Sequence, residues 1–296
     1  MLDVDFGEDV DYDSLAPSDG KLLPKGYLST SQVSQYTKCG HAYYLKYIER
    51  QAGVVPYRMF EGVAVHHAAE KALRLKMADG KRPPLDVVTD AVAEYYDTNA
   101  AVVGDWESTT PDQGKDRGVI LTRAFWEEGL PRSTPIMVEE QFTVTLTGPV
   151  DKRPIPFVGR LDSVQIVLPR ELADMPGVQA SCSTYPRVLV DLKITAAAWT
   201  DKDLRDSLQM ALYADINAVP DVRIDQLVKG GGKKFKPYFQ SLNGSVPAAA
   251  SEHALEVVEG VAKGIMAGVF PKTDPSNWWC SAQWCGQWHR CRGKSK

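Results

Sequence analysis

The chain has 296 residues, of which 44% are hydrophobic and 24% charged, and its formal net charge is −4. This composition is that of a soluble globular protein, and the length allows one large domain or two ordinary ones. No segment approaches the run of about 18 apolar residues that spans a membrane, and the first 20 residues lack a basic and an apolar signal region. We therefore predict no membrane partner and a cytoplasmic location.

The negative charge is concentrated at the N-terminus. Residues 1–20 hold seven of the 38 acidic residues and no lysine or arginine, which leaves 31 acidic against 34 basic residues in the remainder. We predict that residues 1–26 are a disordered acidic tail and that residues 27–296 form one domain. The mild basicity of that domain is compatible with nucleic acid without arguing for it.

Hydrophobic periodicity predicts helices first and strands later. The predicted helices cover residues 29–50, 59–78, 85–103, 115–129, 201–217 and 250–268. The predicted strands cover residues 136–147, 156–168, 187–194, 224–229 and 236–242, with an irregular connection at 169–186. This order predicts an α/β or α+β domain with a mixed central β-sheet flanked by helices, after an N-terminal helical region.

Three polar side chains interrupt the apolar strands. Period two puts Asp191 and Lys193 on one face of strand 187–194, and Asp162 lies within strand 156–168. Two carboxylates on neighbouring strands repel each other when they are close, and a divalent cation relieves that repulsion. Lys193 beside them can orient water or stabilise charge on a phosphate. The alternative is a surface ion pair on an edge strand.

Four short motifs follow one another along the chain. They are G-x-x-x-H-x-x-x-E at 62–70, G-x-x-D at 159–162, D-x-K at 191–193 and Q-x-x-x-Y at 209–213. In this order the chain resembles the PD-(D/E)XK nuclease superfamily, in its RecB-like branch. The resemblance covers most of the chain and implies a restriction-endonuclease-like core.

The resemblance also implies a site for Mg²⁺ or Mn²⁺ next to a catalytic lysine, Lys193. The implied metal ligands are His66, Asp162, Asp191 and the carbonyl oxygen of Leu192. An imidazole ligand makes Mn²⁺ suitable beside Mg²⁺. An ordinary helix histidine, satisfied within the fold, is the alternative for His66.

Further residues flank this implied site. Gln209 and Tyr213 share one face of a helix, and the resemblance implies that they belong to the catalytic site and touch DNA; an ordinary half-buried helix face is the alternative. Glu70, one turn beyond His66, is positioned to orient it. For Glu139 and Glu140, in the strand before Asp162, we predict a solvated face rather than metal binding.

Three of the five cysteines fall in the last 17 residues, at positions 280, 285 and 291. Three closely spaced thiols need a fourth ligand for a tetrahedral zinc site or a four-iron cluster, and Cys39, Cys182 and His289 are candidates. Spacing alone leaves zinc and an iron–sulfur cluster open.

The resemblance selects between them. Iron–sulfur members of the RecB-like branch, among them CRISPR-associated exonucleases and related phage proteins, have one cysteine before the nuclease core and three after it. This implies a structural [4Fe–4S] cluster bound by Cys39, Cys280, Cys285 and Cys291, with zinc as the alternative. Cys182 is then a spare thiol.

Two basic or aromatic segments remain. Residues 229–236 carry four lysines around three glycines, and we expect a solvated turn or a contact to the DNA backbone. Four of the seven tryptophans lie at 278, 279, 284 and 288, where we expect them to surround the cluster rather than stack on bases.

Together these features predict a Mg²⁺- or Mn²⁺-dependent DNA exonuclease that hydrolyses phosphodiester bonds at single-stranded ends. Recombination, repair, phage replication and CRISPR-related processing are all compatible roles, in the host cytoplasm if the protein is phage-encoded. The alternative is a catalytically weak or inactive module that binds DNA ends. A homo-oligomer or a recombination or repair partner remains open.

Overall fold

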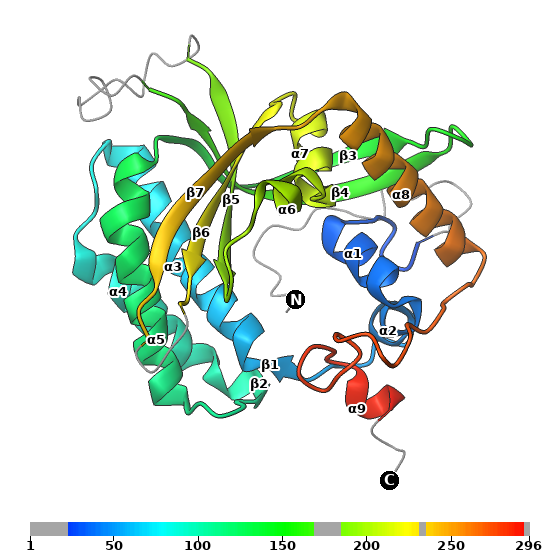
Figure 1. Cartoon of the computed structure of the whole chain (residues 1–296), viewed down its shortest axis with the longest axis horizontal. Coiled ribbons are helices and arrows are strands. Elements are labelled where there is room, and N and C mark those ends of the chain that lie inside the picture. The colour runs from blue at the N-terminus through cyan, green and yellow to red at the C-terminus, as the bar shows by residue number, and fades with distance from the viewer. Residues whose placement is uncertain (1–22, 169–184, 231–234, 293–296) are drawn as a thin grey trace. The chain divides into compact units, whose positions relative to one another are not determined.

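The computed structural model describes residues 23–168, 185–230 and 235–292 (Figure 1). The tail up to residue 22, Cys182, Lys233 and Lys234 lie outside these residues. By its internal contacts the chain divides into two compact units. Unit 1 contains the chain up to Pro56, residues 142–159 and the chain from Ser251 onward, and unit 2 contains residues 57–141 and 160–250.

Unit 1 begins with α1 (Thr30–Lys38) and α2 (Gly40–Tyr43), followed by a π-helical turn at Tyr44–Ile48 and the short strand β1 (Val55–Pro56). The single helix predicted over 29–50 is wrong, because the backbone is extended at Cys39, with φ −163° and ψ 104°. A Cβ atom on Gly40 would lie 2.6 Å from the ring of Pro271, so only glycine permits this close approach. The unit also contains most of α8 (Ala248–Met266) and all of α9 (Trp288–Cys291).

Unit 2 contains a layer of three helices, α3 (Tyr57–Asp79), α4 (Leu85–Asn99) and α5 (Pro111–Ala124), with the short strand β2 (Val103–Asp105) between the last two. Thr110 and Gln113 form a capping box at the start of α5. Short 3₁₀ and π turns at Ala100–Val102, Phe125–Gly129 and Leu130–Arg132 end α4 and α5.

Two short helices replace the predicted helix 201–217, namely α6 (Asp201–Arg205) and α7 (Leu208–Ile216). The break occurs because the hydroxyl of Ser207 accepts a hydrogen bond from the Met210 amide and caps a new helix. None of the helices in the described ranges is long and apolar enough to cross a membrane.

The central sheet has five strands in the order β3-β4-β5-β6-β7. They are β3 (Pro135–Thr147), β4 (Pro154–Ile166), β5 (Arg187–Thr195), β6 (Asp221–Val228) and β7 (Tyr238–Ser245). β5 pairs with β4 and β7 with β6 in antiparallel fashion, whereas β5 and β6 are parallel. The predicted mixed sheet with flanking helices is confirmed, and β5 lies at its centre between partners of opposite direction.

Candidate active site

Strand β5 carries the first two residues of the site, all of which lies in unit 2. Asp191 and Lys193 share one face of the strand, as predicted from period two. The Lys193 ammonium nitrogen lies 2.8 Å from Asp191 Oδ2 and 3.0 Å from Oδ1. Asp191 is only 3% exposed. The pair is therefore an enclosed ion pair, not the exposed pair of an edge strand.

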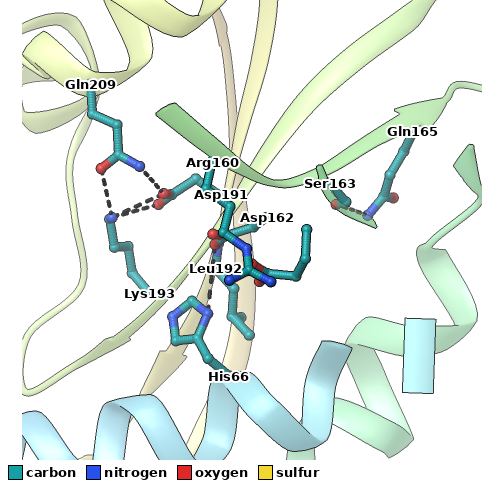
Figure 2. Close-up of polar contacts among 10 residues, drawn as sticks. His66, Arg160, Asp162, Ser163, Gln165, Asp191, Leu192, Lys193 and Gln209 are labelled. Atoms are coloured by element: carbon teal, nitrogen blue, oxygen red, sulfur yellow. Dashed lines mark hydrogen bonds and ion pairs between the residues drawn. The ribbon is translucent and has the colours of Figure 1, made fainter. Parts of the chain in front are cut away.

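Asp162 lies where β4 and β5 separate. Their ladder runs from Ile166 opposite Arg187 to Ser163 opposite Val190. Beyond this last pair, the amide of Leu192, two residues after Val190, donates a hydrogen bond of 2.8 Å to Oδ2 of Asp162. The Asp162 side chain thus accepts a hydrogen bond from a strand amide that would otherwise pair with the backbone of a neighbouring strand. This hydrogen bond fixes Asp162 beside the Asp191–Lys193 pair (Figure 2).

His66, Glu139 and Asp162 form a group that can hold a metal ion. One nitrogen or oxygen from each residue lies within 4.8 Å of the others. His66 Nδ1 lies 3.7 Å from Asp162 Oδ2. One imidazole and two carboxylates suit Mg²⁺ or Mn²⁺. Helix α3 supplies the first ligand and strands β3 and β4 the others, so the group brings together three segments distant in sequence.

The prediction that Glu139 is a solvated strand residue is wrong, whereas Glu140 is exposed as predicted. The Glu139 side chain is 14% exposed, and its carboxylate forms an ion pair with Arg160 Nε at 2.8 Å. Its φ of 51° lies in the left-handed region, which a non-glycine residue rarely adopts. This local distortion of β3 turns Glu139 toward Asp162, as a bulge re-aims a side chain.

The pKa values show how strongly the carboxylates are crowded. Burial and the negative charge of Asp162 raise the pKa of Glu139 to about 8, although Arg160 opposes the shift. Burial also raises the pKa of Asp191, against the effect of Lys193. Burial lowers the pKa of Lys193, but the carboxylates of Asp191 and Asp162 outweigh it and raise that pKa above its ordinary value. Lys193 is therefore a cation at neutral pH.

Helix α7 contributes Gln209, which contacts both members of the Asp191–Lys193 ion pair. The side-chain amide nitrogen of Gln209 donates a hydrogen bond of 2.9 Å to Asp191 Oδ1, and its oxygen accepts a hydrogen bond of 3.4 Å from the Lys193 ammonium (Figure 2). The Tyr213 hydroxyl accepts a hydrogen bond of 3.4 Å from the Arg160 amide, and Tyr213 is 4% exposed. Both residues therefore lie beside the Asp191–Lys193 pair and Arg160, and their catalytic role and contact with DNA stay predictions.

A sequence model of the PD-(D/E)XK nuclease superfamily matches residues 27–292. The chain belongs to this superfamily. A protein of Eubacterium rectale named "Putative exonuclease" has a similar structure, with 14% identity, a TM-score of 0.51 and 93% of each chain covered. The structure of SSO0001 overlaps less well, with 11% identity, a TM-score of 0.34 and 79% of this chain and 86% of that chain covered. No curated protein matches by sequence.

Some residues of this nuclease site were missed by sequence reasoning. Arg160 lies inside the G-x-x-D motif and pairs with Glu139, but nothing in its position marked it. Gln226 is fully buried opposite Lys193 in the β5–β6 register and accepts a 2.6 Å hydrogen bond from the Trp199 amide. The Trp199 ring lies 5.6 Å from the Lys193 ammonium. Gln226 therefore holds an aromatic ring beside the superfamily lysine.

Two motif residues on α3 differ in how the fold uses them. The Glu70 carboxylate forms an ion pair with Arg74 at 2.9 Å and lies 4.0 Å from the Arg160 guanidinium. Its described ion-pair partners are therefore arginines, and His66 is not among them. At Gly62 an added Cβ would meet no atom within 4 Å. Gly62 lies four residues before His66 on the same helix face, so open space adjoins the metal-binding group.

The four cysteines of the predicted cluster all lie in unit 1, Cys39 at the break between α1 and α2 and the others in the C-terminal segment. Burial raises the pKa of the Cys285 thiol, and the other three thiols are close enough to raise it further. Within the described chain, no three of their sulfur atoms come within 4.8 Å of one another.

Backbone hydrogen bonds also join these segments. The Val54 amide donates to the Gly286 carbonyl at 3.0 Å, and the His41 amide donates to the Pro271 carbonyl at 3.0 Å. Figure 1 shows the blue N-terminal helices beside the orange and red C-terminal segment. Among the tryptophans, Trp279 lies under the Lys38 ammonium at 4.5 Å, whereas Trp278 is 70% exposed.

Proposed function

We propose that the protein is a Mg²⁺- or Mn²⁺-dependent deoxyribonuclease that hydrolyses phosphodiester bonds at single-stranded DNA ends. The observation that carries the proposal is the metal-binding group of His66, Glu139 and Asp162 next to the Lys193–Asp191 ion pair. A module that only binds DNA has no need to bring Asp162 close to two other carboxylates, Glu139 and Asp191, because that crowding costs stability.

In this proposal the metal ion is held by His66, Glu139 and Asp162. Asp191 and the Leu192 carbonyl remain predicted ligands; Asp191 lies close enough to Asp162 and His66 for their charges to shift its pKa. A metal bound there polarises the phosphate and lowers the pKa of a bound water molecule. Arg160 holds Glu139 in place through its 2.8 Å ion pair.

Lys193 acts as a cation in this proposal. Its raised pKa means that it holds its proton at neutral pH, so it cannot take a proton from water. It can donate hydrogen bonds to a phosphate oxygen, where negative charge grows during hydrolysis. Asp191 and Gln209 fix its ammonium group, which lowers the cost of orienting it during the reaction.

The preference for DNA ends rests on two kinds of support. The motif order resembles the RecB-like branch, whose members include exonucleases. The Eubacterium rectale protein with the similar fold carries the name "Putative exonuclease". We extend that activity to this chain as a proposal, with single-stranded DNA as the substrate to test first.

We further propose that Cys39, Cys280, Cys285 and Cys291 bind a [4Fe–4S] cluster. Four sulfur atoms on one zinc ion lie about 3.8 Å apart, since Zn–S bonds are about 2.3 Å long. A four-iron cluster binds each sulfur through a different iron atom and so holds them farther apart. The other three thiols lie close enough to raise the pKa of Cys285, as either centre requires, and the resemblance to the iron–sulfur branch favours the cluster.

A cleavage assay tests the nuclease. Anaerobically purified protein is mixed with end-labelled single- and double-stranded DNA and Mg²⁺ or Mn²⁺, and Lys193→Ala is the matched control. We expect metal-dependent release of nucleotides from single-stranded ends that EDTA and the substitution abolish. DNA binding without any cleavage by metal-loaded protein would instead identify an end-binding module.

Metal analysis tests the cluster separately. Iron and acid-labile sulfide are measured in the anaerobic protein and in Cys285→Ser, with visible absorbance as a second readout. We expect iron and sulfide in equal amounts and their loss in the variant. Zinc without sulfide would overturn the cluster and leave the nuclease proposal untouched.

A further inference from the structure

A second charged cluster lies at the start of α3, outside the metal-binding group. Glu61 is completely buried in the helix. Its carboxylate accepts a 2.6 Å hydrogen bond from the Tyr57 hydroxyl, lies 3.4 Å from Arg117 Nε and forms an ion pair with the Lys229 ammonium. Burial and the charge of Glu61 raise the pKa of Tyr57, which keeps its hydroxyl protonated as a donor.

The charges of this cluster do not cancel. One cation is enough to neutralise a buried carboxylate, yet Glu61 has two, Arg117 and Lys229. The Arg117 side chain is 36% exposed and that of Lys229 15%, while Glu61 is inaccessible. The three residues therefore carry one excess positive charge, and solvent reaches it only through the two cations.

An aromatic ring stands beside this charge. The Arg117 guanidinium lies 4.4 Å from the centre of the Phe235 ring, within the range of a cation–π contact. Phe235 is half-buried, and Lys236 next to it is exposed. A guanidinium fixed between a carboxylate and a ring is preorganised to bind a phosphate.

Two measures place this cluster near the metal-binding group. On α3, Glu61 lies five residues before His66, which is about 7.5 Å along the axis and about 140° around it, so the two side chains leave the helix in different directions. On the sheet, Lys193 is opposite Gln226, and Lys229 lies three residues beyond it, which is about 10 Å along the strand. Gly62, where added side-chain volume meets no atom, lies between the two groups on α3.

We infer that Arg117 and Lys229, held by Glu61, bind a backbone phosphate of the substrate strand a few nucleotides from the bond that is cut, and that Phe235 stacks on a base beside it. The inference rests on the proposed function, since the strand bound here is the one hydrolysed. Phosphate contact and base stacking together are how single strands are bound without sequence preference.

Binding of a labelled single-stranded oligothymidylate tests the inference by fluorescence anisotropy over a range of salt concentrations. The parent protein is the full chain with Lys193→Ala, so that no DNA is cut. Arg117→Gln should weaken binding about tenfold and reduce the slope of log affinity against log salt by about 0.7, the value of one phosphate on a single strand. Arg123→Gln, an exposed arginine on the same helix, is the matched control and should change neither.

Equal affinities for the Arg117 and Arg123 variants would overturn the inference. If thermal melting shows that Arg117→Gln does not fold, binding by the Phe235→Ala variant tests the inference instead. It should weaken binding about five- to a hundredfold without changing the salt slope, while Phe235→Trp should restore binding. Parental affinity in Phe235→Ala would refute the subsite. Because the assay needs no cleavage, its outcome is independent of whether the wild-type protein proves to be a nuclease.

Discussion

Replacing Gly62 by alanine should stabilise the protein and impair its activity at the same time. Gly62 lies inside the 23-residue helix α3, where glycine costs about 1 kcal/mol relative to alanine. A Cβ atom there meets nothing within 4 Å, so the described structure offers no steric reason for glycine. The position faces the same way as His66, and we interpret the open space as room for the DNA strand.

The magnitudes follow from these facts. Gly62→Ala should raise the free energy of unfolding by about 1 kcal/mol and the melting temperature by about 2–4 °C. It should lower the rate of single-strand cleavage about 10- to 100-fold, because a displaced substrate reacts far more slowly. Thermal melting and end-labelled cleavage measure the two effects on the same preparation.

Gly260→Ala is the matched control. Gly260 lies inside α8 in unit 1, and an added Cβ there also meets no atom within 4 Å. We expect a similar gain in stability with unchanged cleavage. If Gly62→Ala cleaves as fast as the wild type, the space beside His66 is not used by substrate. If it melts earlier, the helix is packed more tightly at this point than the structure indicates.

Three other substitutions test separate parts of the structure. Lys193→Met should reduce cleavage at least about 100-fold in protein that still folds, although the buried Asp191 loses its cation and the melting temperature should fall. If cleavage is lost only as far as folding is lost, the result contradicts a catalytic role. Glu139 holds a proton below its pKa of about 8, so Mn²⁺ must displace that proton. By calorimetry, the affinity for Mn²⁺ should rise from pH 6 to pH 8. In Glu139→Gln the affinity should be weaker and should rise less over this range. Thr110→Ala removes the capping box of α5 and should cost about 1 kcal/mol in urea unfolding without affecting cleavage.

Local patterns predicted the residues that share a strand or a helix. Alternation in residues 187–194 put Asp191 and Lys193 on one face, and that face is where the structure places them. The four-residue spacing of Gln209 and Tyr213 likewise placed both beside the site. These relations depend only on the period of one element, which a sequence displays directly.

Relations set by distant packing were not predictable in the same way. The helix break at Cys39 depends on the contact between Gly40 and Pro271, more than 200 residues apart. The role of Glu139 depends on its positive φ, which alternation along β3 does not reveal. The split between α6 and α7 is different, because Ser207 is a recognisable capping residue and its signal was present in the sequence.

Glu139 also explains how the site can fold before it binds a metal. Asp162, Asp191 and Glu139 would place three negative charges around Lys193 and Arg160, an arrangement that burial makes costly. The raised pKa of Glu139 means that its carboxyl keeps a proton more readily than an ordinary glutamate, which lowers the cost of this crowding while no metal is bound. Glu139 would have to lose this proton to bind a divalent cation there, because a carboxyl group binds a metal in its ionised form. The left-handed backbone at Glu139 and its crowding against Asp162 thus cost stability in the free protein, and in the proposed metal site they would place Glu139 as a ligand.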